Sequence, residues 1–342
     1  MLINNLFKKS IISALSRIKF SYLKKLSGNN LLLPFYHLVN DNPPPHIRHL
    51  YSVRNVTQFK EDLEFFINNY SPIALSDILS NKKRNLQLPE NSFLLTFDDG
   101  CREMYDVVMP ILLEKGVPAV FFLTTEFLDN KELFYRHKAS LLLDSIERAH
   151  SLNNCGISEV FKANRLEHAD IKRSILTIRS PEKHVLDELA MVLGVDFDEY
   201  LRTNKPYLSS THVKGLIEDG FEIGAHSIDH PDYQLISLKE QLWQTKTSTE
   251  IINESFSLDY TAFATPFTDE GIIAKYFDEI FNRLSVDISF GTSGMKRDSY
   301  MNSMQRVFME GTDKSAVRII SESIVLMLIR SFLNRNTMVR TL

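Results

Sequence analysis

The sequence predicts an α/β fold, because short apolar runs alternate with segments of helical periodicity seven or eight times along its 342 residues. The run 118–124 is almost continuously apolar, which is typical of parallel strands that are buried on both faces. The segment 56–70 repeats apolar residues at the spacing of one helix face. This alternation predicts a mainly parallel sheet, either closed into a barrel or doubly wound.

The expected elements follow one another in a regular order. Strands are expected over 31–37, 72–75, 93–97, 118–124, 221–225, 260–265, 286–290 and 305–309. Helices are expected over 56–70, 103–115, 208–219 and 238–254. Gly116 and Gly220 are stop signals for two of these helices, and Ser237 with Glu240 forms a capping-box pattern at the start of the last one.

The stretch 130–208 breaks this rhythm, because it separates two strands by far more residues than one crossover needs. Its pattern is mainly helical and rich in charges, which predicts a helical insertion rather than a structureless loop. We therefore divide the chain into a basic amphipathic segment over 1–29, an α/β body over 30–312 that contains the insertion, and a C-terminal helical segment over 313–342.

Composition and charge exclude some classes of function. The formal net charge is −4, which argues against a general nucleic-acid-binding protein. The two cysteines, Cys101 and Cys155, do not form a disulfide framework, so a reducing compartment is expected. No apolar run is long enough to span a membrane, and the N-terminus lacks the apolar core of a signal peptide. These features favour a cytoplasmic protein; they do not indicate its oligomeric state.

The N-terminal segment carries a charge pattern of its own. It contains six Lys and Arg residues, and the first acidic residue of the chain is Asp41. Apolar residues recur along one helix face: Ile3, Phe7, Ile11, Leu15, Ile18 and Tyr22. A basic amphipathic helix of this kind can lie on an anionic membrane, so residues 1–28 could make peripheral contact with the inner face of the membrane. The alternative is a helix that packs on the body of the protein.

Two segments carry the residues expected to be functional. Asp98 and Asp99 follow the apolar run 93–97, and His226 and His230 follow the run 221–225. Taken alone, the aspartates could form a turn and the histidines could be solvated. In parallel α/β folds, however, the carboxyl ends of strands hold the active site. The spacing of the histidines predicts that both rings project from one helical turn. Two histidines and one aspartate match a catalytic zinc or another divalent ion, which leaves the second aspartate free as a base.

Together these segments resemble the motifs of the polysaccharide deacetylase family, carbohydrate esterases related to chitin and peptidoglycan N-deacetylases. The similarity extends roughly over residues 31–310. It implies a distorted (β/α) barrel of about seven strands, with Asp98 as general base and with Asp99, His226 and His230 as metal ligands. The segment 263–267 resembles the third family motif, in which Pro266 and Phe267 would shape one wall of the substrate groove.

The chain departs from the family pattern at two positions. Ala264 replaces the arginine that orients the catalytic aspartate in many members. Arg306 could take over that task, but we favour the interpretation that it is a strand-end charge without a catalytic role. The late Leu-x-His motif, which usually supplies the general acid, is absent, since no histidine follows His230. His37, in a segment similar to the opening strand of bacterial exopolysaccharide members, is the first candidate substitute; the alternative is a packed or surface histidine.

The resulting hypothesis is a metal-dependent hydrolase that removes N-acetyl groups from amino sugars of a polysaccharide or a lipid-linked glycan precursor. Zinc is the preferred ion, with cobalt, nickel or manganese as alternatives. A second hypothesis is a catalytically weak or inactive glycan-binding relative that retains the metal, and the missing late histidine motivates it. A glycosidase is disfavoured, because its two carboxylates must flank a sugar bond at about 5–9 Å, whereas Asp98 and Asp99 are adjacent.

Overall fold

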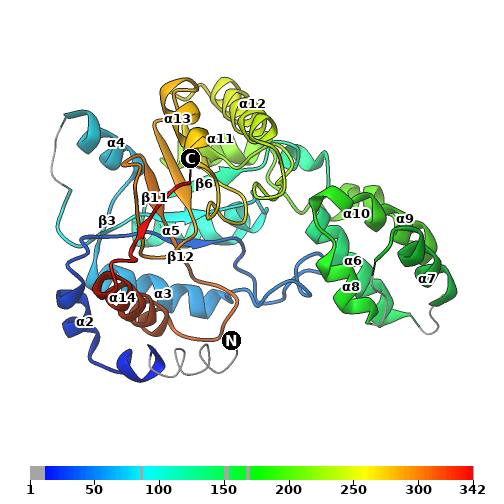
Figure 1. Ribbon diagram of the computed structural model, residues 1–342, viewed down its shortest axis with the longest axis horizontal. Coiled ribbons are helices and arrows are strands. Elements are labelled where there is room, and N and C mark those ends of the chain that lie inside the picture. Colours follow the sequence, from blue (N-terminus) through cyan, green and yellow to red (C-terminus); the bar gives the residue numbers. More distant parts are fainter. Residues whose placement is uncertain (1–11, 85–87, 150–153, 167–169, 342) are drawn as a thin grey trace.

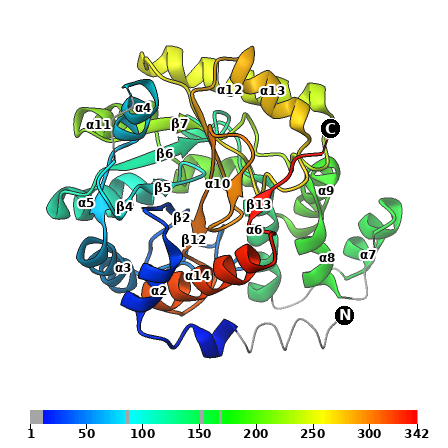
Figure 2. The same ribbon diagram turned by 60° about the vertical axis from the view of Figure 1, so that its left-hand side comes forward.

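The structure is a computed structural model that describes residues 12–84, 88–149, 154–166 and 170–341. Its centre is a sheet of parallel strands in the order β11-β9-β8-β7-β6-β5-β2-β12. The bounds of these strands are β2 (Pro34–Tyr36), β5 (Leu95–Phe97), β6 (Ala119–Leu123), β7 (Glu222–Ala225), β8 (Ala262–Ala264), β9 (Ile288–Gly291), β11 (Ser303–Gln305) and β12 (Val307–Phe308). Helices surround the strands (Figure 2).

The sheet closes through one continuous segment. Only Arg306 separates β11 from β12, yet β11 pairs with β9 and β12 pairs with β2 at the opposite end of the sheet. The backbone N–H of Arg306 donates to the carbonyl of Gly291 (3.1 Å), which holds the crossing point in place. The circle therefore has seven strand positions, and the expectation of a (β/α) barrel of about seven strands is confirmed.

Strand β6 shows why a continuously apolar run suits this architecture. Ala119, Phe121 and Leu123 belong to the cluster between the sheet and its outer helices. Val120 and Phe122 alternate with them and pack in the barrel interior. All five side chains are buried, as parallel strands covered on both faces require.

The outer helices follow the strands along the chain. Their bounds are α3 (Val56–Asn69), α4 (Leu75–Arg84), α5 (Met109–Lys115), α11 (Ser210–Glu218), α12 (Leu238–Phe256), α13 (Ala274–Asn282) and α14 (Ala316–Phe332). Each helix predicted in the body is present, but the one predicted over 103–115 begins with a π-helical turn over Met104–Val108. Asn55 and Ser237 cap α3 and α12 with their side chains.

Short strands form two smaller parallel sheets beside the barrel strands. A three-stranded parallel sheet contains β1 (Leu31–Leu32), β4 (Ser92–Phe93) and β3 (Ser71–Pro72). The predicted strands 31–37 and 93–97 are each divided between this sheet and the barrel. A second pair joins β10 (Arg297–Asp298) to β13 (Thr337–Met338) near the C-terminus.

The described part of the stretch 130–208 is helical and forms a lobe beside the barrel (Figure 1). Its helices are α6 (Tyr135–Arg148), α7 (Asn154–Ala163), α8 (Ile171–Thr177), α9 (His184–Leu193) and α10 (Phe197–Asn204). They enclose a hydrophobic cluster of their own, with Leu142, Ile157 and Leu189 fully buried. Two short 3-10 turns, Leu128–Asn130 and Ser180–Glu182, lie at the edges of the lobe.

Near the N-terminus, α2 (Phe20–Ser27) packs along α14 on the outside of the barrel (Figure 1). Leu23 is buried there, whereas Leu15, Ile18 and Tyr22 are exposed. Ile3, Phe7 and Ile11, which complete the predicted apolar face, lie outside the described residues. None of the described helices has the length and apolar character needed to cross a membrane.

Candidate metal and hydrolytic site

The carboxyl ends of the parallel strands bring the predicted site residues to one rim of the barrel. His37 follows β2, Asp98 and Asp99 follow β5, and His226 follows β7. These residues are neighbours because β2, β5, β6 and β7 are consecutive in the sheet. Such a rim is the usual location of active sites in (β/α) barrels.

Asp99, His226 and His230 converge on one point. Asp99 Oδ1 lies 3.4 Å from His226 Nε2 and 3.2 Å from His230 Nε2, and the two nitrogens are 3.1 Å apart. All three side chains are buried. His226 Nδ1 lies 2.7 Å from the carbonyl oxygen of Ala264, to which it must donate. In the neutral ring this leaves the lone pair on Nε2, which faces the other two groups.

This trio fits a divalent cation. Asp99 Oδ1, although buried, makes no hydrogen bond with any residue that the structure describes. Burial alone would raise the pKa of Asp99, but the two imidazoles lower it well below its ordinary value, so the carboxylate is ionised. One carboxylate oxygen and two imidazole nitrogens, with their ligand atoms within 4.8 Å of one another, are a common donor set for catalytic zinc.

The local backbone differs from the prediction, which placed both imidazoles on one helical turn. Residues 226–230 are not helical. Ser227 and His230 have positive φ angles of 70° and 57°, and Ser227 Oγ accepts the backbone N–H of His230 (3.0 Å). The helical turn was therefore a wrong expectation, because a side-chain hydrogen bond and a left-handed residue turn the chain instead. Asp99 is also left-handed (φ 76°), and strained backbone of this kind often occurs at functional sites.

Asp98 is held by Arg306. The guanidinium donates two hydrogen bonds of 2.7 Å to the two carboxylate oxygens, and both side chains are buried. Burial would raise the pKa of Asp98, but the adjacent guanidinium lowers it below its ordinary value. Arg306 is thus not an unpartnered strand-end charge: the residue lies at the crossing point between β11 and β12, and its guanidinium pairs with the aspartate.

His37 is neither a core histidine nor a free surface histidine. Its Nδ1 lies 2.9 Å from Glu310 Oε2, and the backbone N–H groups of His37 and Leu38 donate to the same carboxylate. Partial burial lowers the pKa of His37, but Glu310, Asp99 and Asp98 raise it more, to about 9. Sequence reasoning did not single out Glu310, although it follows a predicted strand directly.

A cavity of about 430 Å³ opens above these groups. It is lined by His37, Asp98, Asp99, His226, His230 and Phe267, and also by residues that sequence reasoning missed: Tyr51, Phe134, Arg136 and Phe308. Pro266 is buried and does not line the cavity. The Phe134 ring, from the root of the helical lobe, lies 4.5 Å from the His230 ring. No pattern in the sequence connects this residue with the rim.

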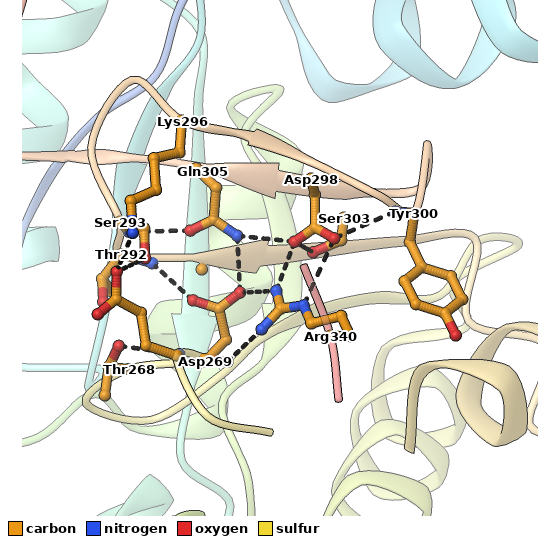
Figure 3. A network of polar contacts seen from close by, with 12 residues as sticks. Thr268, Asp269, Thr292, Ser293, Lys296, Asp298, Tyr300, Ser303, Gln305 and Arg340 are labelled. Atoms are coloured by element: carbon orange, nitrogen blue, oxygen red, sulfur yellow. Dashed lines mark hydrogen bonds and ion pairs between the residues drawn. The ribbon is translucent and has the colours of Figure 1, made fainter. Parts of the chain in front are cut away.

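The loop that carries Phe267 is fixed by a buried polar network (Figure 3). Arg340 forms ion pairs with Asp269 and Asp298, and Gln305 donates to both carboxylates (2.6 and 3.1 Å). Gly291 is required beside it, because a Cβ atom there would lie 2.2 Å from Asp269 Oδ1. The C-terminal residues therefore hold the groove wall in position.

Comparison with known proteins agrees with this geometry. The family model described as polysaccharide deacetylase matches residues 85–286, which is more than half of the chain. The chain belongs to the polysaccharide deacetylase family. No curated protein sequence matches significantly, so the assignment depends on the family model and the fold.

Several solved structures share the fold of this chain. The deacetylase PplD of Streptococcus pyogenes, in complex with acetate, aligns with a TM-score of 0.54 over 86% of this chain and 98% of its own, at 15% identity. IcaB of Ammonifex degensii aligns with a TM-score of 0.54 over 87% of this chain and 98% of its own, also at 15% identity. A de-N-acetylase of Aggregatibacter actinomycetemcomitans aligns with a TM-score of 0.52, at 14% identity, over 86% of this chain and 100% of its own.

Proposed function

We propose that this chain is a metal-dependent N-deacetylase that acts on an amino sugar of a polysaccharide or a lipid-linked glycan precursor. One observation carries the proposal: Asp99, His226 and His230 form a ligand set at the rim of a cavity, and Asp98 lies beside them with its charge maintained by Arg306. Zinc is the preferred ion, with cobalt, nickel or manganese as alternatives.

Asp99, His226 and His230 would hold the ion, which supplies Lewis-acid polarisation of the acetamide and a water of lowered pKa. Asp98 is the general base in this scheme. It is ionised and its two oxygens are oriented by Arg306, so it can accept the proton of the attacking water. Thr96 Oγ1 accepts a further hydrogen bond from Arg306 (3.0 Å), which limits rotation of the guanidinium.

His37 is the proposed general acid. Glu310 accepts at Nδ1, so Nε2 is the nitrogen that can deliver a proton into the cavity that His37 lines. The sugar amine needs such a proton on its nitrogen when the C–N bond breaks, because the deprotonated amine (R–NH⁻) is a poor leaving group. This arrangement weakens the reason for the inactive glycan-binding alternative, which depended on the missing late histidine.

The experiment is an assay of acetate release from N-acetylglucosamine oligomers by zinc-loaded protein. Asp98→Asn should lower the rate by about a thousandfold, because it removes the proton acceptor while it preserves shape. Glu182→Gln, on the exposed edge of the lobe, is the matched control and should retain the wild-type rate. A wild type that binds the oligomers but releases no acetate would contradict the proposal and would favour the glycan-binding alternative.

We also propose that the protein works in the cytoplasm, at the inner face of the membrane. The exposed apolar residues of 12–28 support this: Leu15, Ile18, Tyr22 and Leu26 are exposed on α2 and on the segment before it, which turns at residues 16–19. Exposed basic residues accompany them: Arg17, Lys19 and Lys25. Exposed apolar residues flanked by cations suit an anionic lipid surface.

A further inference from the structure

Among the described residues that line the cavity, Arg136 is the one cation without a role in the proposed reaction. It lies in the first turn of α6, at the root of the helical lobe, and lines the same cavity as Asp98 and His230. It is partly buried, so part of its surface is removed from bulk water.

The partners of Arg136 differ from those of the buried arginines Arg54, Arg306 and Arg340. Arg54 pairs with Asp62, Arg306 with Asp98, and Arg340 with two aspartates. Arg136 donates to the carbonyl oxygen of Leu176, and within the described part of the chain no carboxylate forms an ion pair with it. A guanidinium removed from water without a counter-charge is unfavourable, unless a ligand supplies the charge.

A second guanidinium strengthens the positive potential here. Burial lowers the pKa of Arg136, and the charge of Arg179 acts in the same direction. Arg179 reaches the carboxylate of Asp232 only at 3.9 Å. A guanidinium remains charged at all physiological pH values and offers a planar set of donors that matches a carboxylate or a phosphate.

We propose that Arg136 is a substrate-binding residue for an anionic group, a carboxylate or a phosphate, that the glycan carries next to its N-acetylated sugar. This inference depends on the proposed function and makes it more specific: the preferred substrate is an acidic glycan or a phosphate-linked sugar rather than a neutral oligomer. The acetamido group is placed at the aspartate–histidine trio, and the anionic group is placed at the lobe side of the cavity.

The test compares three saccharides: a neutral N-acetylglucosamine tetramer, a tetrasaccharide of alternating N-acetylglucosamine and glucuronate, and N-acetylglucosamine 1-phosphate. The kcat and KM values are measured for the zinc-loaded wild type, Arg136→Gln, Arg136→Lys and the control Arg202→Gln, whose guanidinium is exposed on α10. Binding of each saccharide is measured in parallel by calorimetry. Every protein in this binding series also carries Asp98→Asn, so the effect of that substitution is the same for all of them and cancels when saccharides are compared.

Arg136→Gln should weaken binding of an anionic saccharide by at least about tenfold, as expected for loss of a charge-assisted hydrogen bond, and should change the neutral tetramer less than twofold. Arg136→Lys should recover part of the affinity. The affinities of the glucuronate-containing tetrasaccharide and of N-acetylglucosamine 1-phosphate show whether the site prefers a carboxylate or a phosphate. The inference is overturned if the wild type binds neither anionic saccharide better than the neutral one, or if Arg136→Gln weakens all three equally.

The two proposals fail in different ways. Binding of an anionic saccharide that depends on Arg136, without acetate release from any saccharide, would reject the proposed function and retain the anion site. Acetate release from all three saccharides at equal efficiency, unchanged by Arg136→Gln, would retain the proposed function and reject the anion site.

Discussion

At the scale of single residues, two adjacent aspartates have different surroundings. Asp98 faces a guanidinium and Asp99 faces two imidazoles, although one peptide bond joins them. The left-handed backbone at Asp99 (φ 76°) and at Gly100 (φ 73°) directs the chain away from the strand directly after the pair. The two carboxylates can therefore serve as base and as ligand without competing for the same partner.

The pH dependence of catalysis tests the proposed acid. His37 must be protonated to act, so activity should fall as the pH rises through its pKa of about 9. Glu310→Gln removes the carboxylate that raises this pKa, and burial then dominates. The alkaline limb of the kcat profile should move to lower pH by about one unit or more.

The wild type and Glu310→Gln are compared under identical metal loading, because a bound cation affects the pKa of His37 in both proteins. Glu218→Gln, at an exposed position of α11, is the control and should leave the profile unchanged. An alkaline limb that stays in place in Glu310→Gln would show that His37 is not the acid.

At the scale of elements, the C-terminal strand pair supports the substrate groove. β13 pairs with β10, and Arg340 then inserts between Asp269 and Asp298 (Figure 3). Thr292 Oγ1 donates to the carbonyl of Phe267 (2.9 Å), which ties the cavity-lining residue to the same region.

Arg340→Met should therefore leave two buried carboxylates without their cation. We expect the free energy of unfolding to fall by about 3–5 kcal/mol, as for other broken buried ion pairs. In the variant that remains folded, KM should rise more than kcat falls, because the Phe267 wall loses its support. Denaturant titration and steady-state kinetics measure both effects. Arg335→Met, at an exposed position nearby, should change neither quantity, and an equal effect of both variants would refute this account.

The sequence predicted the elements of the barrel better than the contacts between them. The strand ends that carry Asp98, Asp99 and His226 were predictable, because short, mainly apolar runs end directly before these polar side chains. The partnership of Arg306 with Asp98 was not, since it depends on a strand that is interrupted at one residue to close the sheet. Glu310 and Arg340 likewise depend on long-range packing, which leaves no periodic signal in the chain.

At the scale of the whole molecule, the barrel supplies the chemical groups and the lobe supplies part of the cavity wall. The helical character of 130–208 was predictable from its periodicity. The contribution of Phe134 and Arg136 to the cavity was not, because it depends on how the lobe meets the rim.

The exposed apolar and basic residues of α2 and of the turn before it predict membrane attachment. The full chain should sediment with vesicles of mixed neutral and anionic lipid and not with neutral vesicles, since each basic residue near the surface contributes about 1 kcal/mol. Replacing Leu15, Tyr22 and Leu26 together by Ser should weaken sedimentation by at least about tenfold, because their exposed apolar area no longer enters the interface. Met191→Ser, an exposed apolar residue on the lobe, is the control. Equal sedimentation of the triple variant and the wild type would contradict this surface assignment.

The central claim is that Asp99, His226 and His230 hold one divalent ion, and elemental analysis of the purified chain tests it most directly. The wild type should contain about one zinc or related ion per chain, and His184→Ala, which removes an exposed imidazole of the lobe, should retain it. His226→Ala and His230→Ala should lose it. A double variant lacking both His226 and His230 that still binds the ion as tightly as the wild type would contradict the claim.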